Sequence, residues 1–313
     1  MGMMKKKIIN WIGRLLMLLS IVFIALKILE YREDMQMVCG IKEFVRMGVC
    51  AALYAAVVYS CPLIYQYVLL ITSNKKISYI KVAYIYCKSN ILKYLPGNVM
   101  QYVGRNEIAL TENILHREAA MATLLEIIVT IISSIIIAVV FSGSYAVEWI
   151  SRFAADKFIW FTVIILGVCA AVAVIVVKYK KKLVNYIGNI LNKGNIKRFM
   201  KAVVISIVIM ILNSILYFYI LSILGIRLER RQYGIGIGLY SLSFVLGYIT
   251  PGVPGGIGVR EAVLVYFYSA FISESQILTG SIVFRIISII GDFIALVIAM
   301  IISKFKNKEG VKE

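Results

Sequence analysis

The chain has 313 residues, of which 61% are hydrophobic and only 16% are charged. Ordinary soluble domains contain roughly 45–50% apolar and about 25% charged residues, so composition excludes a soluble globular protein. The net charge of +18 comes from basic residues scattered between apolar stretches, with no compact basic domain, which argues against nucleic-acid binding. Such an excess is typical of cytoplasmic loops that contact anionic lipid head groups. We therefore predict an all-α polytopic membrane protein.

The absence of cysteine, histidine and nucleotide-binding motifs argues against several kinds of chemistry. The five cysteines form no Cys-x-x-Cys pair, and His116 is the only histidine. A zinc site, a multi-histidine metal site and a histidine-based catalytic triad are therefore not expected. The chain also lacks a G-x-x-x-x-G-K-[ST] motif, which argues against built-in ATP hydrolysis. We expect neither a metal nor a cofactor.

Six apolar stretches are long enough to cross the bilayer, which requires about 20 helical residues. The first resembles a signal peptide, but its apolar run continues to about Leu29 without a small-residue cleavage site, so we expect a retained span. The six predicted spans are 8–29, 47–71, 118–141, 158–177, 201–224 and 279–302.

Two further apolar stretches are short and are broken by proline and glycine. Residues 78–94 contain three lysines and end close to Pro96-Gly97. Residues 234–249 run into a segment with two prolines and four glycines between Thr250 and Gly258, and a short apolar piece, 261–272, follows. Irregular backbone at membrane depth requires surrounding protein or a wet cavity. We predict two broken re-entrant hairpins.

The distribution of lysine and arginine predicts the orientation. With the N-terminus inside, the inner segments contain 22 basic residues and the outer segments contain eight. The positive-inside rule then places both termini in the cytoplasm. Residues 305–313 form a short basic cytoplasmic tail, and the expected location is the cytoplasmic (plasma) membrane, crossed several times.

The two hairpins suggest an internal repeat. Pro96-Gly97 and Pro254-Gly255 are 158 residues apart, about half of the chain. We predict a single domain, 1–313, with repeat halves 1–150 and 151–304. Three crossings per half would invert the second copy, as in many transporters with a site near the midplane. The alternative is coincidence, since Pro-Gly is common and all spans look alike.

The segment from Thr250 to Glu261 is the strongest candidate site. Its prolines and glycines prevent a continuous helix, and a helix restarting near Arg260 would point its N-terminal amides at the break, where an anion binds readily. The alternative is an ordinary extracellular turn. The candidate residues are Pro251, Gly252, Pro254, Gly255, Gly256, Gly258 and Glu261.

Charged residues supply the other candidates. Arg105 follows Pro96 and Gly97, and we read it either as a cation beside a lipid phosphate or as a solvated cytoplasmic charge. Glu126, Arg285 and Asp292 lie inside predicted spans, where charge is costly and usually functional. Arg285 and Asp292 are two helical turns apart on one face, so both are expected at one cavity. The alternative is that these charges pair only to satisfy burial.

At these motifs the chain resembles the lysylphosphatidylglycerol synthase transmembrane-region family, also called flippase-like integral membrane proteins. The matching features are Pro96, Gly97 and Arg105, the glutamate at 126, the T-P-x-x-P-G-G-I-G-V-x-E element from Thr250 to Glu261, and Arg285. The resemblance implies a membrane domain that moves a lipid. Only about ten residues follow the last predicted span, so we expect no cytosolic synthase domain.

The first functional hypothesis is a lipid translocase for an anionic or aminoacylated phospholipid or a polyprenyl-phosphate-linked sugar. The resemblance adds a glycosyltransferase or lipid-modifying enzyme as a partner, besides membrane lipids, and an oligomer remains open. The second hypothesis is a membrane transferase with Glu126 or Glu261 as base. The third is a non-transporting partner in a cell-envelope glycosylation complex.

Overall fold

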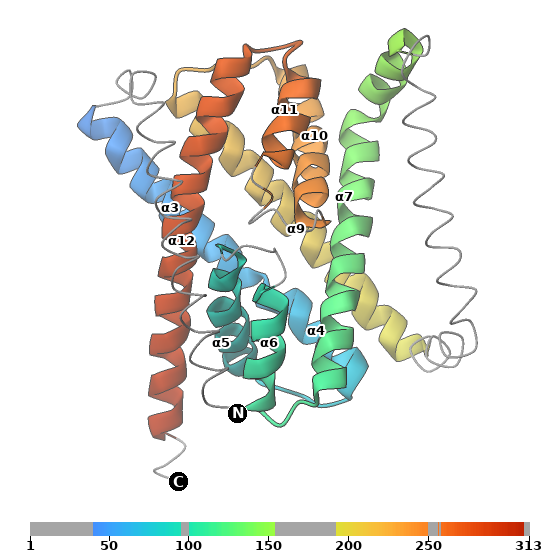
Figure 1. The fold of residues 1–313 in the computed structure, drawn as a ribbon, viewed down its shortest axis with the longest axis vertical. Helices are drawn as coiled ribbons and strands as arrows, with labels where there is room; N and C mark the ends of the chain where they lie inside the picture. Colours follow the sequence, from blue (N-terminus) through green and yellow to red (C-terminus); the bar gives the residue numbers. More distant parts are fainter. Residues whose placement is uncertain (1–39, 95–99, 154–191, 250–255, 257, 310–313) are drawn as a thin grey trace, which may run out of the picture.

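Figure 1 shows the fold in a computed structural model, which describes residues 40–94, 100–153, 192–249, 256 and 258–309. The described residues are almost entirely helical. The elements are α3 (Ile41–Ser60), α4 (Pro62–Ser73), α5 (Tyr79–Asn90), the 3-10 helix η2 (Ile91–Tyr94), α6 (Met100–Leu110), α7 (His116–Phe153), α9 (Lys193–Ile223), α10 (Arg230–Ile249), α11 (Val259–Tyr268) and α12 (Glu274–Glu309).

Four described helices are long and apolar enough to cross a membrane: Ile41–Ser73, His116–Tyr145, Lys193–Ile223 and Glu274–Lys306. They contain the predicted spans that begin near 47, 118, 201 and 279. Their outer faces expose large apolar side chains, among them Phe44, Val140 and Val297, as expected of helices that face lipid. The predicted spans 8–29 and 158–177 lie outside the described residues.

The first long helix is interrupted at Cys61, where α3 ends and α4 begins. Pro62 occupies the first position of α4 and has no N–H to continue the helical ladder. The backbone N–H of Cys61 donates to the Val58 carbonyl at 3.1 Å. Cys61 lies on the wall of a central cavity, so the interruption occurs beside the candidate site.

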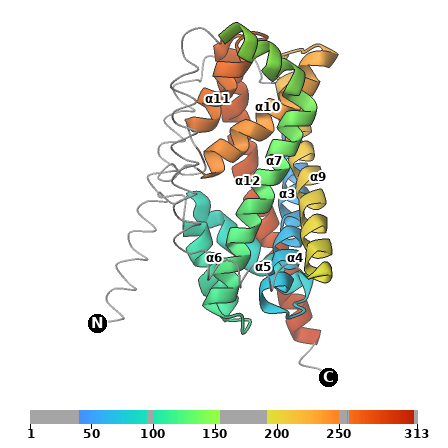
Figure 2. The ribbon, with the colours of Figure 1, turned by 90° about the vertical axis from the view of Figure 1, so that its right-hand side faces the viewer.

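Two pairs of helices occupy opposite ends of the molecule (Figures 1 and 2). The α5–η2 and α6 pair lies at the end where α12 finishes, and the α10 and α11 pair lies at the end where α12 begins. The α5 and α6 helices have 12 and 11 residues and α11 has 10, all fewer than the roughly 20 needed to cross a bilayer, whereas α10 has 20 residues. The described elements end at Tyr94 and Ile249 and resume at Met100 and Val259, and most of the proline- and glycine-containing segments between them lie outside the described residues.

The same order of elements occurs twice. A long helix, a short pair and a second long helix follow one another as α3–α4, α5/α6 and α7, and again as α9, α10/α11 and α12. Shifting the starts of α6 and α7 by the predicted 158 residues gives 258 and 274, and the observed starts of α11 and α12 are Val259 and Glu274. In Figure 1, α7 and α12 run in opposite directions.

The apolar core has two main parts, one for each pair. The α4–α7 part contains Tyr65, Val68 and Ile85 and packs α5 against α4, α7 and the start of α9. The α9–α12 part is rich in aromatic side chains, including Tyr217 and Phe284, and packs α10 and α11 against the end of α9 and α12. The polar groups described below lie between these two parts.

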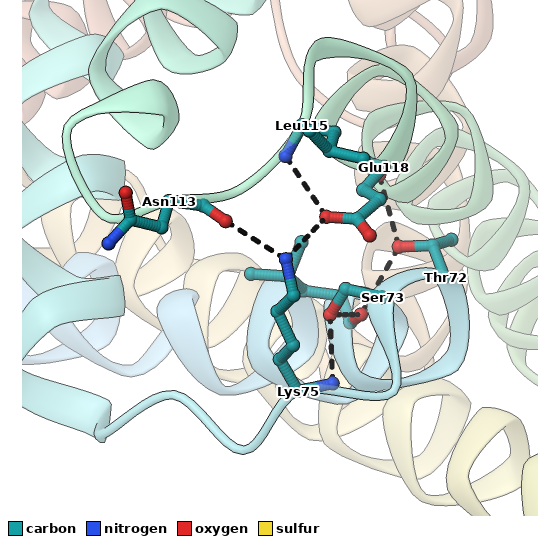
Figure 3. A network of polar contacts seen from close by, with 7 residues as sticks. Thr72, Ser73, Lys75, Asn113, Leu115 and Glu118 are labelled. Atoms are coloured by element: carbon teal, nitrogen blue, oxygen red, sulfur yellow. Dashed lines mark hydrogen bonds and ion pairs between the residues drawn. The ribbon is translucent and has the colours of Figure 1, made fainter.

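A polar network fastens the connection between α6 and α7 to the end of α4 (Figure 3). The Lys75 ammonium donates to the Asn113 carbonyl at 2.9 Å and lies 3.4 Å from a Glu118 carboxylate oxygen. That oxygen also accepts the Leu115 N–H at 3.0 Å, and the Thr72 hydroxyl donates to the Glu118 carbonyl. The network is at the surface and remote from the cavity.

Candidate functional site

A cavity of about 180 Å³ lies between the two core parts, and residues from all ten described helical elements line it. Its wall includes four basic side chains and one carboxylate: Lys93, Arg105, Arg260, Arg285 and Glu126. Two further carboxylates, those of Glu261 and Asp292, form ion pairs with lining residues. The cavity is therefore a charged chamber inside an otherwise apolar protein.

The first charged group is a buried ion pair between α6 and α7. Arg105 and Glu126 are 1% and 3% exposed, and an Arg105 guanidinium nitrogen contacts a Glu126 carboxylate oxygen. The Arg105 Nε donates to the Ser89 hydroxyl at 3.3 Å, and the guanidinium lies over the rings of Tyr86 and Tyr65 at 4.0 and 4.9 Å from their centroids. Pairing and stacking together compensate the desolvation of this arginine.

The second group joins α5 and η2 to α12. The Asp292 side chain is fully buried, and one of its oxygens lies 2.6 Å from the Lys93 ammonium. The Tyr94 hydroxyl donates to the same oxygen, and the Asn90 amide donates to the other at 2.8 Å. Asp292 thus has a cation and two further donors, supplied by three residues that line the cavity.

The third charged group joins α12 to the start of α11. The Arg285 Nε donates to a Glu261 carboxylate oxygen at 2.6 Å, and an Arg285 Nη reaches the Gly256 carbonyl at 3.3 Å. The other Glu261 oxygen accepts the Gly258 N–H at 2.7 Å, which is the backbone half of a capping box. One of the amides expected to bind an external anion is therefore occupied within the chain.

Two glycines allow the helices at this break to approach closely. Gly256 has φ of +70°, and a Cβ there would come within 2.8 Å of the Gly247 Cα in α10. A Cβ on Gly247 would meet the Arg260 Cγ at 2.4 Å. Any larger side chain would push α11 away from α10. The glycines therefore set the position of Arg260 at the cavity.

Arg260 differs from the other lining cations because no described carboxylate forms an ion pair with it. An Nη atom donates to the Tyr240 hydroxyl at 2.9 Å. The guanidinium carbon lies 5.3 Å from the Tyr240 ring centroid and 5.0 Å from that of Phe244. The side chain is held by aromatic groups. The described carboxylate of Glu261 acts on it electrostatically but makes no ion-pair contact with it, and Glu261 is itself paired with Arg285.

The structure brings the described candidate residues to this cavity. Arg105, Glu126 and Arg285 line it, and Gly256, Gly258, Glu261 and Asp292 contact one another or a lining residue. Arg285 and Asp292 lie on one helix as expected, but they bind different partners and do not pair. The candidates Pro96, Gly97, Pro251, Gly252, Pro254 and Gly255 lie outside the described residues.

Sequence reasoning missed Lys93 and Arg260 as site residues. Each is a basic residue next to a proline- and glycine-containing segment in the sequence, and this position could have identified both as candidates. It also did not single out the tyrosines of the wall, which belong to no motif in the sequence. The lining tyrosines are Tyr54, Tyr86, Tyr94, Tyr240 and Tyr248.

The chain belongs to a known membrane family. The family described as "Lysylphosphatidylglycerol synthase TM region" matches residues 67–295, which include every charged side chain of the cavity described above. A search of curated proteins found no match. The family membership and the apolar helices establish an integral membrane protein.

Proposed function

We propose that this chain is a lipid translocase that moves a lipid with an anionic head group across the cytoplasmic membrane. The observation that carries the proposal is the central cavity, where four cations from helices far apart in sequence surround one space. Charged side chains at membrane depth are costly and usually line a substrate or ion pathway. The head group would occupy this cavity while the lipid chains remain in the bilayer.

The architecture supports alternating access to such a cavity. We propose that α5/α6 and α10/α11 are re-entrant hairpins of an inverted repeat, entering from opposite faces with both termini cytoplasmic. The repeated order of helices and the matching starts of α6 with α11 and α7 with α12 support this interpretation. Rocking of one half against the other would then open the cavity to each face in turn.

The transferase alternative has less support from the site. A transferase would use Glu126 or Glu261 as a base. Glu126 is engaged by Arg105, and Glu261 is engaged by Arg285 and the Gly258 amide. Both carboxylates are therefore already engaged by partners within the chain. No described carboxylate reaches the cavity without an ion-pair partner.

The test is transport in reconstituted liposomes. Head-group-labelled phosphatidylglycerol is placed in both leaflets, and an impermeant reductant then quenches the outer-leaflet label. Protein-free liposomes should lose about half of the signal, and liposomes with the protein should lose nearly all of it. Signal loss equal to that of protein-free liposomes contradicts translocation of this lipid.

Matched variants connect transport to the cavity. Arg285→Ala removes a lining cation and should slow the quenching of inner-leaflet lipid. Arg230→Ala removes an exposed arginine at the start of α10 and should leave the rate unchanged. Equal rates for the two variants contradict the role assigned to Arg285. Conversion of a lipid substrate by detergent-purified protein would instead favour the transferase.

A further inference from the structure

The charges of the cavity leave one cation unmatched. Lys93 pairs with Asp292, Arg105 pairs with Glu126, and Arg285 pairs with Glu261. Arg260 has the Tyr240 hydroxyl and two aromatic rings as direct contacts, and the Glu261 charge acts on it without an ion-pair contact. Within the described residues, the cavity therefore contains four cations and three carboxylates, and all three carboxylates are already engaged.

The segments 95–99 and 250–257 contain no acidic residue that could pair with Arg260. Residues 95–99 are Leu-Pro-Gly-Asn-Val, and residues 250–257 are Thr-Pro-Gly-Val-Pro-Gly-Gly-Ile. Neither segment contains an aspartate or a glutamate. Within the described residues, no carboxylate forms an ion pair with Arg260, although an uncompensated charge is costly for a side chain that is partly withdrawn from water.

The remainder of the wall is polar but uncharged. Five tyrosines line the cavity, and side-chain hydroxyl and amide groups extend the polar surface. Such groups both donate and accept hydrogen bonds, so they suit the hydroxyls of a glycerol or a sugar. The uncharged hydroxyl and amide residues of the wall, besides the tyrosines, are Asn90, Gln101, Thr130, Ser206, Asn213, Ser241 and Ser288.

We infer that Arg260 binds the phosphate of the transported lipid, and that the cavity selects a phosphate linked to a neutral hydroxyl-bearing group over an aminoacylated head group. This inference rests on the proposed function for its physiological meaning. A phosphate would supply the charge that Arg260 lacks and would accept its guanidinium hydrogen bonds. Phosphatidylglycerol and a prenyl-phosphate sugar share this chemistry.

An aminoacylated head group fits this cavity poorly for the same reason. A lysyl ester adds two ammonium groups to the phosphate, and each requires an anion or several acceptors when it leaves water. Glu126, Glu261 and Asp292 are the described carboxylates at the cavity, and taking any of them would leave a buried or partly buried arginine or lysine unpaired. Breaking a buried ion pair in this way is strongly unfavourable.

Binding in detergent tests the inference without requiring transport. The purified chain is titrated by calorimetry with short-chain phosphatidylglycerol, short-chain lysyl-phosphatidylglycerol, a short prenyl-phosphate glucoside and free glycerol phosphate. We expect the first and third probes to bind at least about tenfold more tightly than the lysyl lipid. We expect glycerol phosphate to bind weakly, because it lacks the apolar chains.

Substitutions at Arg260 test whether this residue binds the phosphate. Arg260→Gln should weaken phosphatidylglycerol binding about tenfold or more, while Arg260→Lys should retain part of the affinity because it keeps the charge. Arg230→Gln, at an exposed arginine of α10, is the matched control and should bind as the unchanged chain does. Size-exclusion profiles before and after heating show whether each variant is folded.

If Arg260→Gln does not fold, a variant designed to bind the lysyl lipid more tightly provides a second test of the inference. Asn213 lines the cavity and donates only to the Ile209 carbonyl of its own helix. Asn213→Asp would add an unengaged carboxylate of nearly the same shape. It should shift the affinity ratio at least about tenfold toward lysyl-phosphatidylglycerol, and an unchanged ratio contradicts the charge argument.

The outcomes separate this inference from the proposed function. Equal affinity for the lysyl and glycerol lipids, or equal affinity of Arg260→Gln and Arg230→Gln for phosphatidylglycerol, overturns the inference. If glycerol phosphate binds as tightly as the lipid does, the lipid specificity of the proposed site is overturned. Selective binding without liposome transport would support the inference and contradict translocation, whereas transport without selectivity would support translocation alone.

Discussion

The Lys93 ammonium, in the 3-10 helix η2 that follows α5, lies 2.6 Å from the Asp292 carboxylate in the last long helix. This contact joins elements from the two halves of the chain at the edge of the cavity. The Asp292 side chain is fully buried, and the Lys93 side chain is 19% exposed. The two halves are therefore connected by a charge pair beside the proposed substrate site.

We expect Asp292→Asn to destabilise the protein. The amide keeps the shape of the side chain but removes the negative charge, so Lys93 loses its counter-ion and Tyr94 loses a charged acceptor. The cost should be on the order of 2 kcal/mol or more, measured as a lower melting temperature in detergent. Adding Lys93→Met to this variant should recover part of the loss, and a further drop contradicts the argument.

The Arg105–Glu126 pair should show strong coupling in a double-mutant cycle. Glu126→Gln alone leaves a buried guanidinium without its carboxylate and should cost about 3–5 kcal/mol. Replacing both residues by leucine should cost less than the sum of the two single leucine substitutions, because no buried charge remains. The cycle is measured by thermal melting, and additive effects would show that the pair is not coupled.

Gly256→Ala should disrupt the break between α10 and α11. The left-handed φ of +70° and the approach of 2.8 Å to the Gly247 Cα both oppose a Cβ. The left-handed conformation alone costs about 1–2 kcal/mol, and displacement of α11 should also weaken binding at Arg260. Melting temperature and phosphatidylglycerol affinity should both fall.

Gly234→Ala is the control for that substitution. Gly234 lies within α10, and a Cβ there would meet nothing within 4 Å. Alanine should therefore be neutral or stabilise the helix by up to about 1 kcal/mol. A loss as large as that of Gly256→Ala would show that glycine content in general, and not the close approach at the break, determines stability.

Lys75→Met should have little effect on stability, in contrast to the buried pairs. The Lys75 side chain is 47% exposed, and its ion pair with Glu118 is at 3.4 Å. Exposed pairs contribute about 0–1 kcal/mol, and salt screens them. The difference in melting temperature from the unchanged chain should be small and should shrink further at high salt. A large loss would give the network in Figure 3 a structural role beyond a surface contact.

Local features predicted much of the described fold. Four apolar stretches became long helices because hydropathy over about 20 residues is a property of the segment itself. The ends of the described elements at Tyr94 and Ile249, and the start of α11 at Val259, agree with proline and glycine, which act on the backbone where they occur. Charge inside predicted spans singled out Glu126, Arg285 and Asp292; the first two line the cavity, and Asp292 pairs with the lining residue Lys93.

The amino-acid sequence by itself determined that this is a helical membrane protein with interrupted helices and internal charge, because composition and chain breaks act locally. Only the tertiary structure decided which charges neutralise one another. Arg105 meets Glu126 and Arg285 meets Glu261 because consecutive helices pack side by side, and Lys93 meets Asp292 because η2 packs against the distant helix α12. Pairing energies depend on distance and burial, which spacing along the chain does not specify. That packing pairs Glu261 with Arg285 and leaves Arg260 in contact with aromatic rings, without an ion-pair partner among the described residues.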